Sequence, residues 1–277
     1  MTMKNKESIV LLISFLLALT PFRGIAQTDT IPDHKITTSV KMIGIGGTNI
    51  LDTYISPEKY TGPEIRFISM VNKQKVGRNI STMMMNQGDL SYSKNRASNS
   101  DEIAGMYNFA YGLHYNWSLL GGNLRLQAGG LLDLNLGFIY NTRNSNNPAQ
   151  ARCYLNLTPS GSAEYDWHIH DHIYMLRYAV QLPLVGVMFS PNYGQAYYEI
   201  FSKGNYDHNI VPTTFISAPC FRQMFTVDFN LWHTTFRVGY MGDYQQSSVN
   251  NLKSHIYTHS LVIGVVRRFS LLNIRRK

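Results

Sequence analysis

The chain is short of charged residues and of long apolar runs. Asp, Glu, Lys and Arg make up 15% of its 277 residues, against about 25% in a typical soluble domain. After the first 26 residues no stretch approaches the roughly 20 apolar residues that a membrane-spanning helix needs, which excludes a helical membrane protein. Aromatic residues are abundant, with 18 Tyr and 13 Phe. This mixture is typical of a barrel that faces lipid outside and is polar inside.

Cysteine is also scarce, and the two present, Cys153 and Cys220, lack the spacing of a metal site. Cys153 falls on the apolar face of its expected strand and Cys220 on the polar face of another. Their side chains would point to opposite sides of a barrel wall, so we expect no disulfide between them.

The net charge of +8 does not indicate a nucleic-acid partner. A nucleic-acid-binding protein would need a basic face on a known module, and none is evident. Five basic residues lie near the end of the chain, which favours a charged, solvated barrel rim. They are Arg267, Arg268, Arg275, Arg276 and Lys277.

The first residues are typical of a secretory signal peptide. Lys4 and Lys6 precede an apolar core over 9–19, and small residues lead up to Ala26. We expect cleavage after Ala26, which makes 1–26 a signal peptide and 27–277 the exported domain. The alternative is an uncleaved amphipathic anchor.

Period-two alternation of apolar and polar residues predicts long strands. It is clearest over 103–117, 124–140 and 152–168, where each segment reaches or exceeds the roughly 9–11 residues of a tilted transmembrane strand. Further strands are expected over 174–184, 221–231, 236–244 and 255–269, with fainter ones near 37–47, 62–72 and 79–93. The sequence therefore predicts an all-β, antiparallel transmembrane barrel of about ten strands.

The chemistry of the two faces predicts which one looks inward. The apolar face is broad and ends in aromatic residues such as Trp117, Tyr140 and Trp167, like the girdles at membrane interfaces. The other face is rich in small and polar residues with isolated charges of both signs. We expect these charges to form a ladder that fills the lumen: Arg125, Asp133, Arg152, Glu164, Asp166, Arg177, Arg222, Asp228, Arg237 and Asp243.

Connection lengths support the barrel. Ten strands give short turns at 118–123, 169–172 and 231–233, and longer connections at 48–61, 94–101, 142–148, 186–217 and 249–254. Membrane barrels have such a short-turn end, with both termini, in the periplasm. The segment 186–217 is either an external loop or a hidden hairpin of 197–201 with 213–216, so twelve strands is the alternative count.

Motifs near the two ends resemble an uncharacterised family of Gram-negative outer-membrane barrels, domain of unknown function 3316. The resemblance rests on Leu51-Asp52-Thr53-Tyr54, Gly62-Pro63-Glu64, Thr258-His259-Ser260-Leu261 and Arg267-Arg268-Phe269, together with Gly44, Gly46 and Gly47. It implies an outer-membrane barrel and no particular activity.

Candidate chemistry is sparse. His168, His170 and His172 could share a metal ion along an extended strand, but no second group with ligand spacing accompanies them, which favours a polar turn. His259 and Ser260 are adjacent and point to opposite faces, so they cannot form a nucleophile–base pair. His114, Glu164, Asp228 and Asp243 could face the lumen, where charge pairing is the more common role. No cofactor is expected.

The sequence leaves several functions open. We expect an outer-membrane barrel, structural or acting through its surface, with a side-chain-filled lumen, because ten strands leave little space for an aqueous channel. The alternatives are a small channel or hydrophobic-solute transporter, a membrane-embedded hydrolase, and a secreted soluble β-sandwich that binds a ligand. The expected partners are outer-membrane lipid and the barrel-assembly machinery, and the ligand is not specified. The polar, aromatic tract 51–62 is expected to be loop-like, and it could bind a surface ligand or fold over the barrel mouth.

Overall fold

A computed structural model describes residues 35–170 and 172–271, so the signal peptide expected at 1–26 lies outside the described residues. Twelve strands occupy most of this part. They are β1 (Lys35–Asp52), β2 (Ser56–Lys75), β3 (Ile80–Asn95), β4 (Asp101–Leu119), β5 (Leu124–Asn141), β6 (Ala149–Ile169), β7 (His172–Gln181), β8 (Val185–Phe189), β9 (Ile210–Thr214), β10 (Phe221–Leu231), β11 (Thr234–Val249) and β12 (Leu252–Leu271). The helix α2 (Tyr197–Phe201) and the 3-10 turn η1 (Leu120–Gly122) are both short. No helix in the described ranges is long and apolar enough to cross a membrane.

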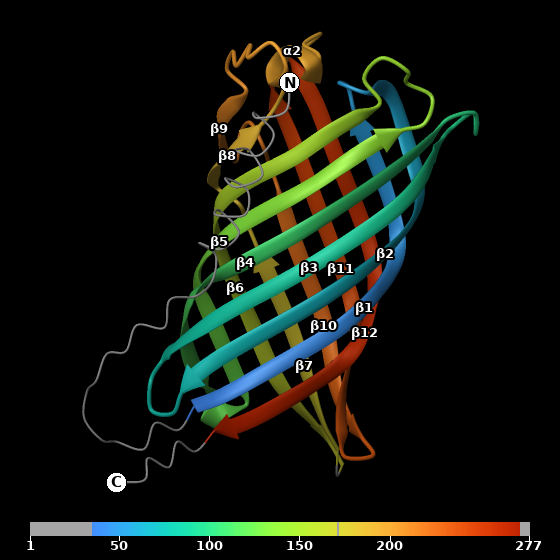
Figure 1. The fold of residues 1–277 in the computed structure, drawn as a ribbon. Coiled ribbons are helices and arrows are strands. Elements are labelled where there is room, and N and C mark those ends of the chain that lie inside the picture. The colour runs from blue at the N-terminus through green and yellow to red at the C-terminus, as the bar shows by residue number, and fades with distance from the viewer. Residues whose placement is uncertain (1–34, 171, 272–277) are drawn as a thin grey trace. The chain divides into compact units, whose positions relative to one another are not determined.

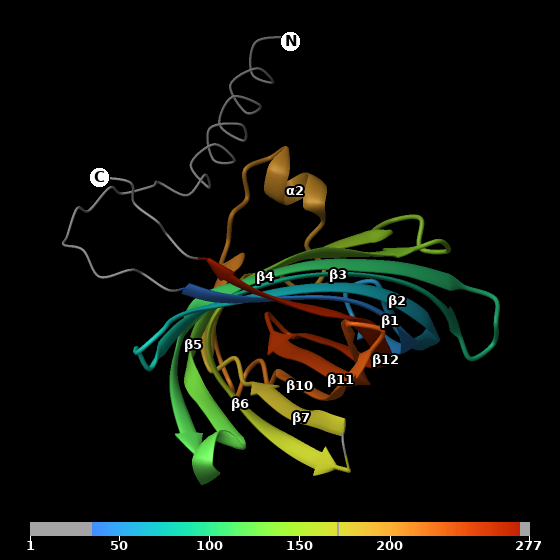
Figure 2. The same ribbon diagram turned by 90° about the horizontal axis from the view of Figure 1, so that it is seen from below.

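Ten of these strands close a barrel (Figure 1). Each pairs antiparallel with its neighbours, β1 pairs with β12, and the ring runs β1 to β7 and then β10 to β12. Figure 2 shows this wall along the barrel, with β5 and β6 between β4 and β7. The expected ten-stranded antiparallel barrel is therefore confirmed, and the soluble β-sandwich alternative is wrong.

The remaining two strands form a hairpin beside the wall. β8 follows β7 after Leu182-Pro183-Leu184 and continues the pairing with β6, so the pair β7–β8 acts as one kinked strand. β9 pairs with β8. A hairpin inside 186–217 was a correct alternative, but its expected arms are wrong. Residues 197–201 form α2, because the N-terminal Glu199 side chain bonds back to the Ala196 N–H and starts a helical turn.

The two ends of the barrel differ as expected. The end that carries the start of β1 and the end of β12 has tight turns, and we call it the turn end. The opposite end, the loop end, carries 96–100, 142–148 and 190–209, with α2. The expected long loop 48–61 is wrong: β1 and β2 extend through it and leave only the turn 53–55. Likewise, 250–251 alone joins β11 to β12.

The pleat sorts the side chains as the alternation predicts. On β4, Tyr107, Tyr111 and Leu113 are exposed on the outer face, whereas Asn108 and Ala110 are buried in the lumen. Along β1 and β2 both faces carry apolar residues, because the lumen-facing Met42, Ile68 and Met70 are also buried.

Candidate functional site

The outer face of the wall is an apolar surface. Ile45, Leu261 and Ile263 are 59–68% exposed although they are aliphatic. Tyr115 and Trp117 pack against each other near the turn end with tilted rings, at 4.8 Å between ring centroids. A wide apolar band with aromatic residues at its edge is the kind of surface that a bilayer covers. A closed barrel also pairs its backbone N–H and C=O groups between strands, as the bilayer interior requires.

The centre of the lumen holds a buried ionic network around Asp243. Arg66 donates to Glu64 Oε1 at 2.6 Å, to Asp243 Oδ2 at 3.1 Å and to Thr258 Oγ1 at 2.9 Å, and lies 3.6 Å from Asp89 Oδ2. These groups come from β2, β3, β11 and β12, so the network joins β2 and β3 to the last two strands of the chain on either side of β1.

Arg222, on β10, extends this network to the opposite wall. Its Nε and Nη2 donate to Asp243 Oδ2 at 3.2 and 3.1 Å, and its Nη1 donates to Asn108 Oδ1 at 3.1 Å and to Gln181 Oε1 at 3.0 Å. Asn108 in turn donates to Asp133. The guanidinium therefore fills the space between β4, β7 and β11.

A branch of the network reaches the loop end through Arg152. Its Nε donates to the Tyr154 hydroxyl at 2.8 Å, and its Nη1 donates to Ser254 and lies 3.8 Å from Asp52 Oδ2. Tyr154 donates to Gln245 Oε1 at 3.1 Å. β6 is thereby joined to the end of β1 and to β11 and β12.

An apolar layer lies in the lumen beside the ionic network and is dominated by methionine. Methionine is flexible and polarisable, so it fills irregular gaps. Its buried residues close the barrel mainly through apolar contact: Val40, Met42, Ile68, Met70, Met83, Met85, Ala110, Leu131, Met224, Met241, Val262 and Val266.

A second ionic group lies toward the turn end. Arg237 forms a bidentate pair with Asp228 at 2.6 and 2.7 Å, and Arg177 donates to Glu164 Oε1 at 3.1 Å. Arg125 forms a more exposed bidentate pair with Asp166 at 2.7 and 2.8 Å. A cavity of about 320 Å³ lies between these arginines and the start of β1.

A cap of apolar and aromatic residues covers the lumen at the loop end. Tyr54 packs edge-on against Tyr197, with centroids 5.7 Å apart, and donates to the Gln195 carbonyl at 3.0 Å. Burial, with the nearby Asp52 and Glu199 carboxylates, raises the pKa of Tyr54 to about 12. Ile50, Tyr60 and Ile256 lie in the same cluster, so the tract 51–62 does help to close the mouth, but as strand ends and a turn.

The wall has a seam between β9 and β11. Among the described strands β9 pairs with β8 alone, and Pro212, which has no N–H, lies within it, as in strands that do not pair on their outer edge. Segment 215–220 bridges to β11 through Ser217 O, which accepts from Ser248 N at 2.8 Å, and through the Cys220 thiol, 3.6 Å from the Gln246 carbonyl oxygen.

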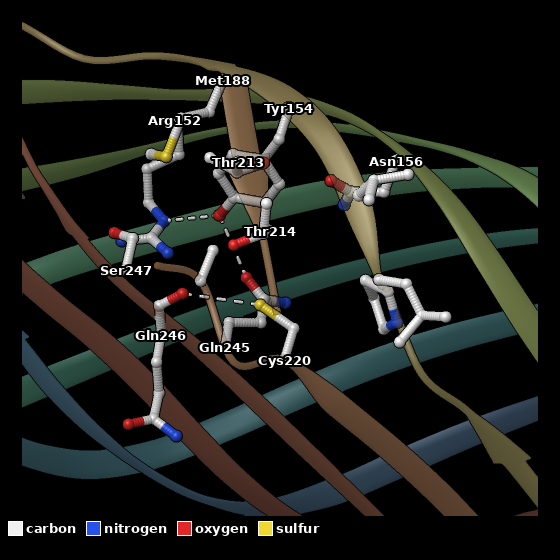
Figure 3. Close-up of a pocket in the computed structure, with 14 residues that line it drawn as sticks. Arg152, Tyr154, Asn156, Met188, Thr213, Thr214, Cys220, Gln245, Gln246 and Ser247 are labelled. Carbon is white, nitrogen blue, oxygen red and sulfur yellow. Dashed lines mark hydrogen bonds between the residues drawn. The ribbon is translucent and has the colours of Figure 1, made fainter. Parts of the chain in front are cut away.

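A small pocket of about 20 Å³ lies at this seam (Figure 3). Arg152, Tyr154 and Gln245 form its lumen side, and Thr213 and Cys220 contribute from β9 and from the end of segment 215–220. The pocket has room for about one water molecule. Both cysteines are free.

The residues expected in the charge ladder fall into the two ionic groups. Asp133, Arg152, Arg222 and Asp243 belong to the central network, and the other six to the group near the turn end. Four acids and one arginine of the lumen escaped sequence reasoning, all buried except Asp89, whose side chain is 12% exposed: Asp52, Glu64, Arg66, Asp89 and Glu102. Glu64 and Arg66 stand two residues apart in the expected strand 62–72, and this spacing predicts that both charges lie on the same face of that strand.

Other candidate chemistry is not brought together. His168, His170 and His172 lie at the β6–β7 turn, and within the described ranges no three His, Cys, Asp or Glu side chains are placed to hold a metal ion. His114 contacts Ser160 Oγ at 2.6 Å inside the lumen. Its Nδ1 has no hydrogen-bond partner among the described residues, so the pair lacks the orienting acid of a nucleophile–base–acid arrangement.

Comparison with known proteins places this barrel in a family. The model of a family described as "Protein of unknown function (DUF3316)" matches residues 9–276. A search of curated proteins found no match.

Solved structures with a similar fold are outer-membrane and autotransporter barrels. The transport unit of the autotransporter AIDA-I from Escherichia coli is 9% identical, with 92% of this chain and 97% of that chain covered and a TM-score of 0.40. The outer-membrane protease OmpT from Escherichia coli is 7% identical, with 88% and 99% covered and a TM-score of 0.43. The translocator domain of the autotransporter NalP from Neisseria meningitidis is 11% identical, with 96% and 97% covered and a TM-score of 0.40. These similarities are distant, and the assignment to a membrane rests on the barrel's own apolar exterior.

Proposed function

We propose a function from two premises: the chain belongs to the DUF3316 family, and its barrel has a filled lumen. It is an outer-membrane β-barrel that does not conduct and that acts as a structural element or through its surface. Its termini face the periplasm and its loop end faces outward. The barrel-assembly machinery inserts it after removal of 1–26.

The observation that carries this proposal is the succession of closed layers along the lumen. The cap around Tyr54, the ionic network around Asp243 and the methionine-rich layer each cross the barrel with buried side chains. An ion would have to displace several of them together. Aqueous channels have wider walls of 16–18 strands.

Exposed aromatic residues at the loop end support a role in surface interaction. Tyr193, Tyr198, Phe201 and Tyr206 are 64–73% exposed on segment 190–209. Aromatic side chains are enriched where protein interfaces form, and large exposed apolar groups on one loop indicate a binding surface.

The test is conductance in planar lipid bilayers with the purified, refolded chain. We expect no stepwise conductance at 1 M KCl from the unaltered barrel. Met42→Ala combined with Met241→Ala, which thins the apolar layer, serves as the control for sensitivity and should raise leakage. Regular ohmic steps from the unaltered chain would refute the proposal and favour the small channel.

The seam between β9 and β11 favours a second candidate, uptake of hydrophobic solutes through the side of the wall. Its test uses the native Cys220 in a Cys153→Ser background. A lipid-soluble maleimide dissolved in the bilayer should label Cys220 if the seam opens toward lipid. If Cys220 of the folded barrel is labelled no faster than it is at low temperature, where unfolding is excluded, lateral opening is refuted. Labelling of the denatured chain controls for the reactivity of the thiol.

A further inference from the structure

The cavity of about 320 Å³ near the turn end has an unbalanced charge. The charged residues of its lining are four arginines and one acid: Arg125, Arg177, Arg237, Arg268 and Glu164. Asp166 adds a pair with Arg125 at 2.7 Å. Asp228 adds a pair with Arg237 at 2.6 Å. Four cations therefore share three carboxylates, so one positive charge has no counter-charge among the described residues. Because an unpaired charge is costly in a partly buried site, this cavity favours an anion.

Arg177 and Arg268 are the cations that are incompletely paired. The Arg177 side chain is 7% exposed, and its Nε donates to Glu164 Oε1 at 3.1 Å. Glu164 is shared, however, because its Oε2 accepts from Arg125 Nε at 3.3 Å. Arg177 Nη1 has no hydrogen-bond partner among the described residues. Unsatisfied buried donors of this kind are rare, and a bound ion is one recognised reason for them.

Met175 brings these guanidinium groups to one side of the cavity. Arg268 Nη2 lies 3.6 Å from Met175 Sδ, and Arg125 Nη2 lies 3.0 Å from the same sulfur. Met175 stands two residues before Arg177, so both side chains lie on the same face of β7. Arginines from β5, β7 and β12 therefore converge there, and in that part of the described lumen Arg268 forms no ion pair.

The opposite side of the cavity is apolar. Val40, Met70 and Met83, from β1, β2 and β3, line it and belong to the methionine-rich layer. At the rim, Ile36 also lines the cavity and is 45% exposed, so the cavity opens at the turn end. A ligand that enters would meet guanidinium groups on one side and apolar side chains on the other.

We propose that this cavity binds an amphipathic carboxylate, held at its charged end by Arg268 and Arg177 and along its alkyl chain by Val40, Met70 and Met83. Guanidinium groups bind carboxylates through paired N–H donors. The volume is near the lower limit of small-molecule sites, which suits a chain of about eight carbons rather than a whole lipid. The site does not depend on the proposed function, although that function implies that the ligand comes from the periplasm.

The experiment is equilibrium dialysis of radiolabelled octanoate against the full refolded chain in nanodiscs of zwitterionic lipid. Empty nanodiscs give the baseline for partition into lipid. We expect saturable binding of about one octanoate per chain. Arg268→Gln should weaken this binding roughly tenfold, because it removes a hydrogen bond between charged groups. Arg268 is exposed at the rim, so its substitution should leave the fold intact.

Arg267→Gln is the matched control. It removes the same charge one position earlier, on the outer face of β12, and should leave the affinity unchanged. Unlabelled octanol, which lacks the carboxylate, and acetate, which lacks the alkyl chain, should both compete more weakly than unlabelled octanoate.

Three results would overturn the proposal. They are binding no greater than to empty nanodiscs, equal affinities of the Arg267→Gln and Arg268→Gln variants, and competition by octanol as strong as by octanoate. Stepwise conductance would instead refute the closed barrel of the proposed function and would leave the dialysis result as it stands, so the two failures are distinguishable.

Discussion

Replacing Arg66 by methionine tests whether the central ionic network holds the barrel together. Arg66 has a side-chain exposure of 1% and faces Glu64, Asp89 and Asp243 within 3.6 Å. Methionine keeps much of the length and apolar volume but leaves the carboxylates without their cation. Removing one partner of a buried ion pair costs about 3–5 kcal/mol, so we expect Arg66→Met to lower the free energy of unfolding by that amount.

The assay is urea-dependent unfolding in lipid vesicles, followed by tryptophan fluorescence. Arg125→Met is the matched control, because Arg125 is 32% exposed and its partner Asp166 is 24% exposed; an ion pair of that kind contributes about 1 kcal/mol or less. Adding Glu64→Gln to Arg66→Met should recover part of the loss, because it removes one of the uncompensated charges. A loss below about 1 kcal/mol for Arg66→Met would refute the assignment of a structural role to the network.

Two further predictions test the membrane assignment. Folded protein in the outer-membrane fraction should migrate at a different position on a gel before and after boiling, whereas a soluble periplasmic chain with no shift would contradict the barrel. Leu261, on the outer face at 68% exposure, is expected near the bilayer midplane, so Leu261→Arg should lower the free energy of unfolding in vesicles by about 2–4 kcal/mol. Phe269→Arg, at the turn end, should lower it by about 1 kcal/mol or less. Equal effects of the two substitutions would contradict this assignment of depth.

Much of the barrel was predictable where its two faces differ in chemistry. On β4 and β5 the outer face is apolar and the inner face carries residues such as Asn108 and Asp133, so alternation gives the strands and their orientation. The connection 142–148 agrees with the bounds of β5 and β6, because its run of Asn and Pro ends both strands.

The first three strands were fainter for a physical reason. Their inner faces supply Met42, Ile68 and Met85 to the apolar layer, so both faces are apolar and the alternation disappears. The alternate charges at Glu64 and Arg66 were then the remaining sign of an inner face, and without an apolar–polar contrast around them the centre of the ionic network was missed. Apolar and polar residues alternate along a strand only where its outer face meets lipid and its inner face meets a polar lumen. Where the lumen is itself partly apolar, both faces carry apolar residues and the alternation is lost.

The short helix α2 and the seam depend on contacts that a sequence pattern does not contain. Residues 197–201 are aromatic and resemble a strand, but Tyr197 donates to Gln150 at 2.8 Å and packs on Tyr54. These partners lie about 50 and 140 positions away in the chain. Tertiary packing therefore decided the local conformation.

The link between Arg66 and Asp243 also has a consequence for how the molecule is made. The two residues are 177 positions apart, and Thr258, which Arg66 also contacts, is 192 positions away. Contacts of such high contact order form late, because the intervening chain must first be arranged. A growing sheet that already contains β2 but still lacks β11 and β12 would hold an arginine paired with Glu64 but without Asp243 and Thr258. Completion of the ring adds both remaining acceptors together, so the final closure of β1 on β12 should be cooperative and slow to reverse.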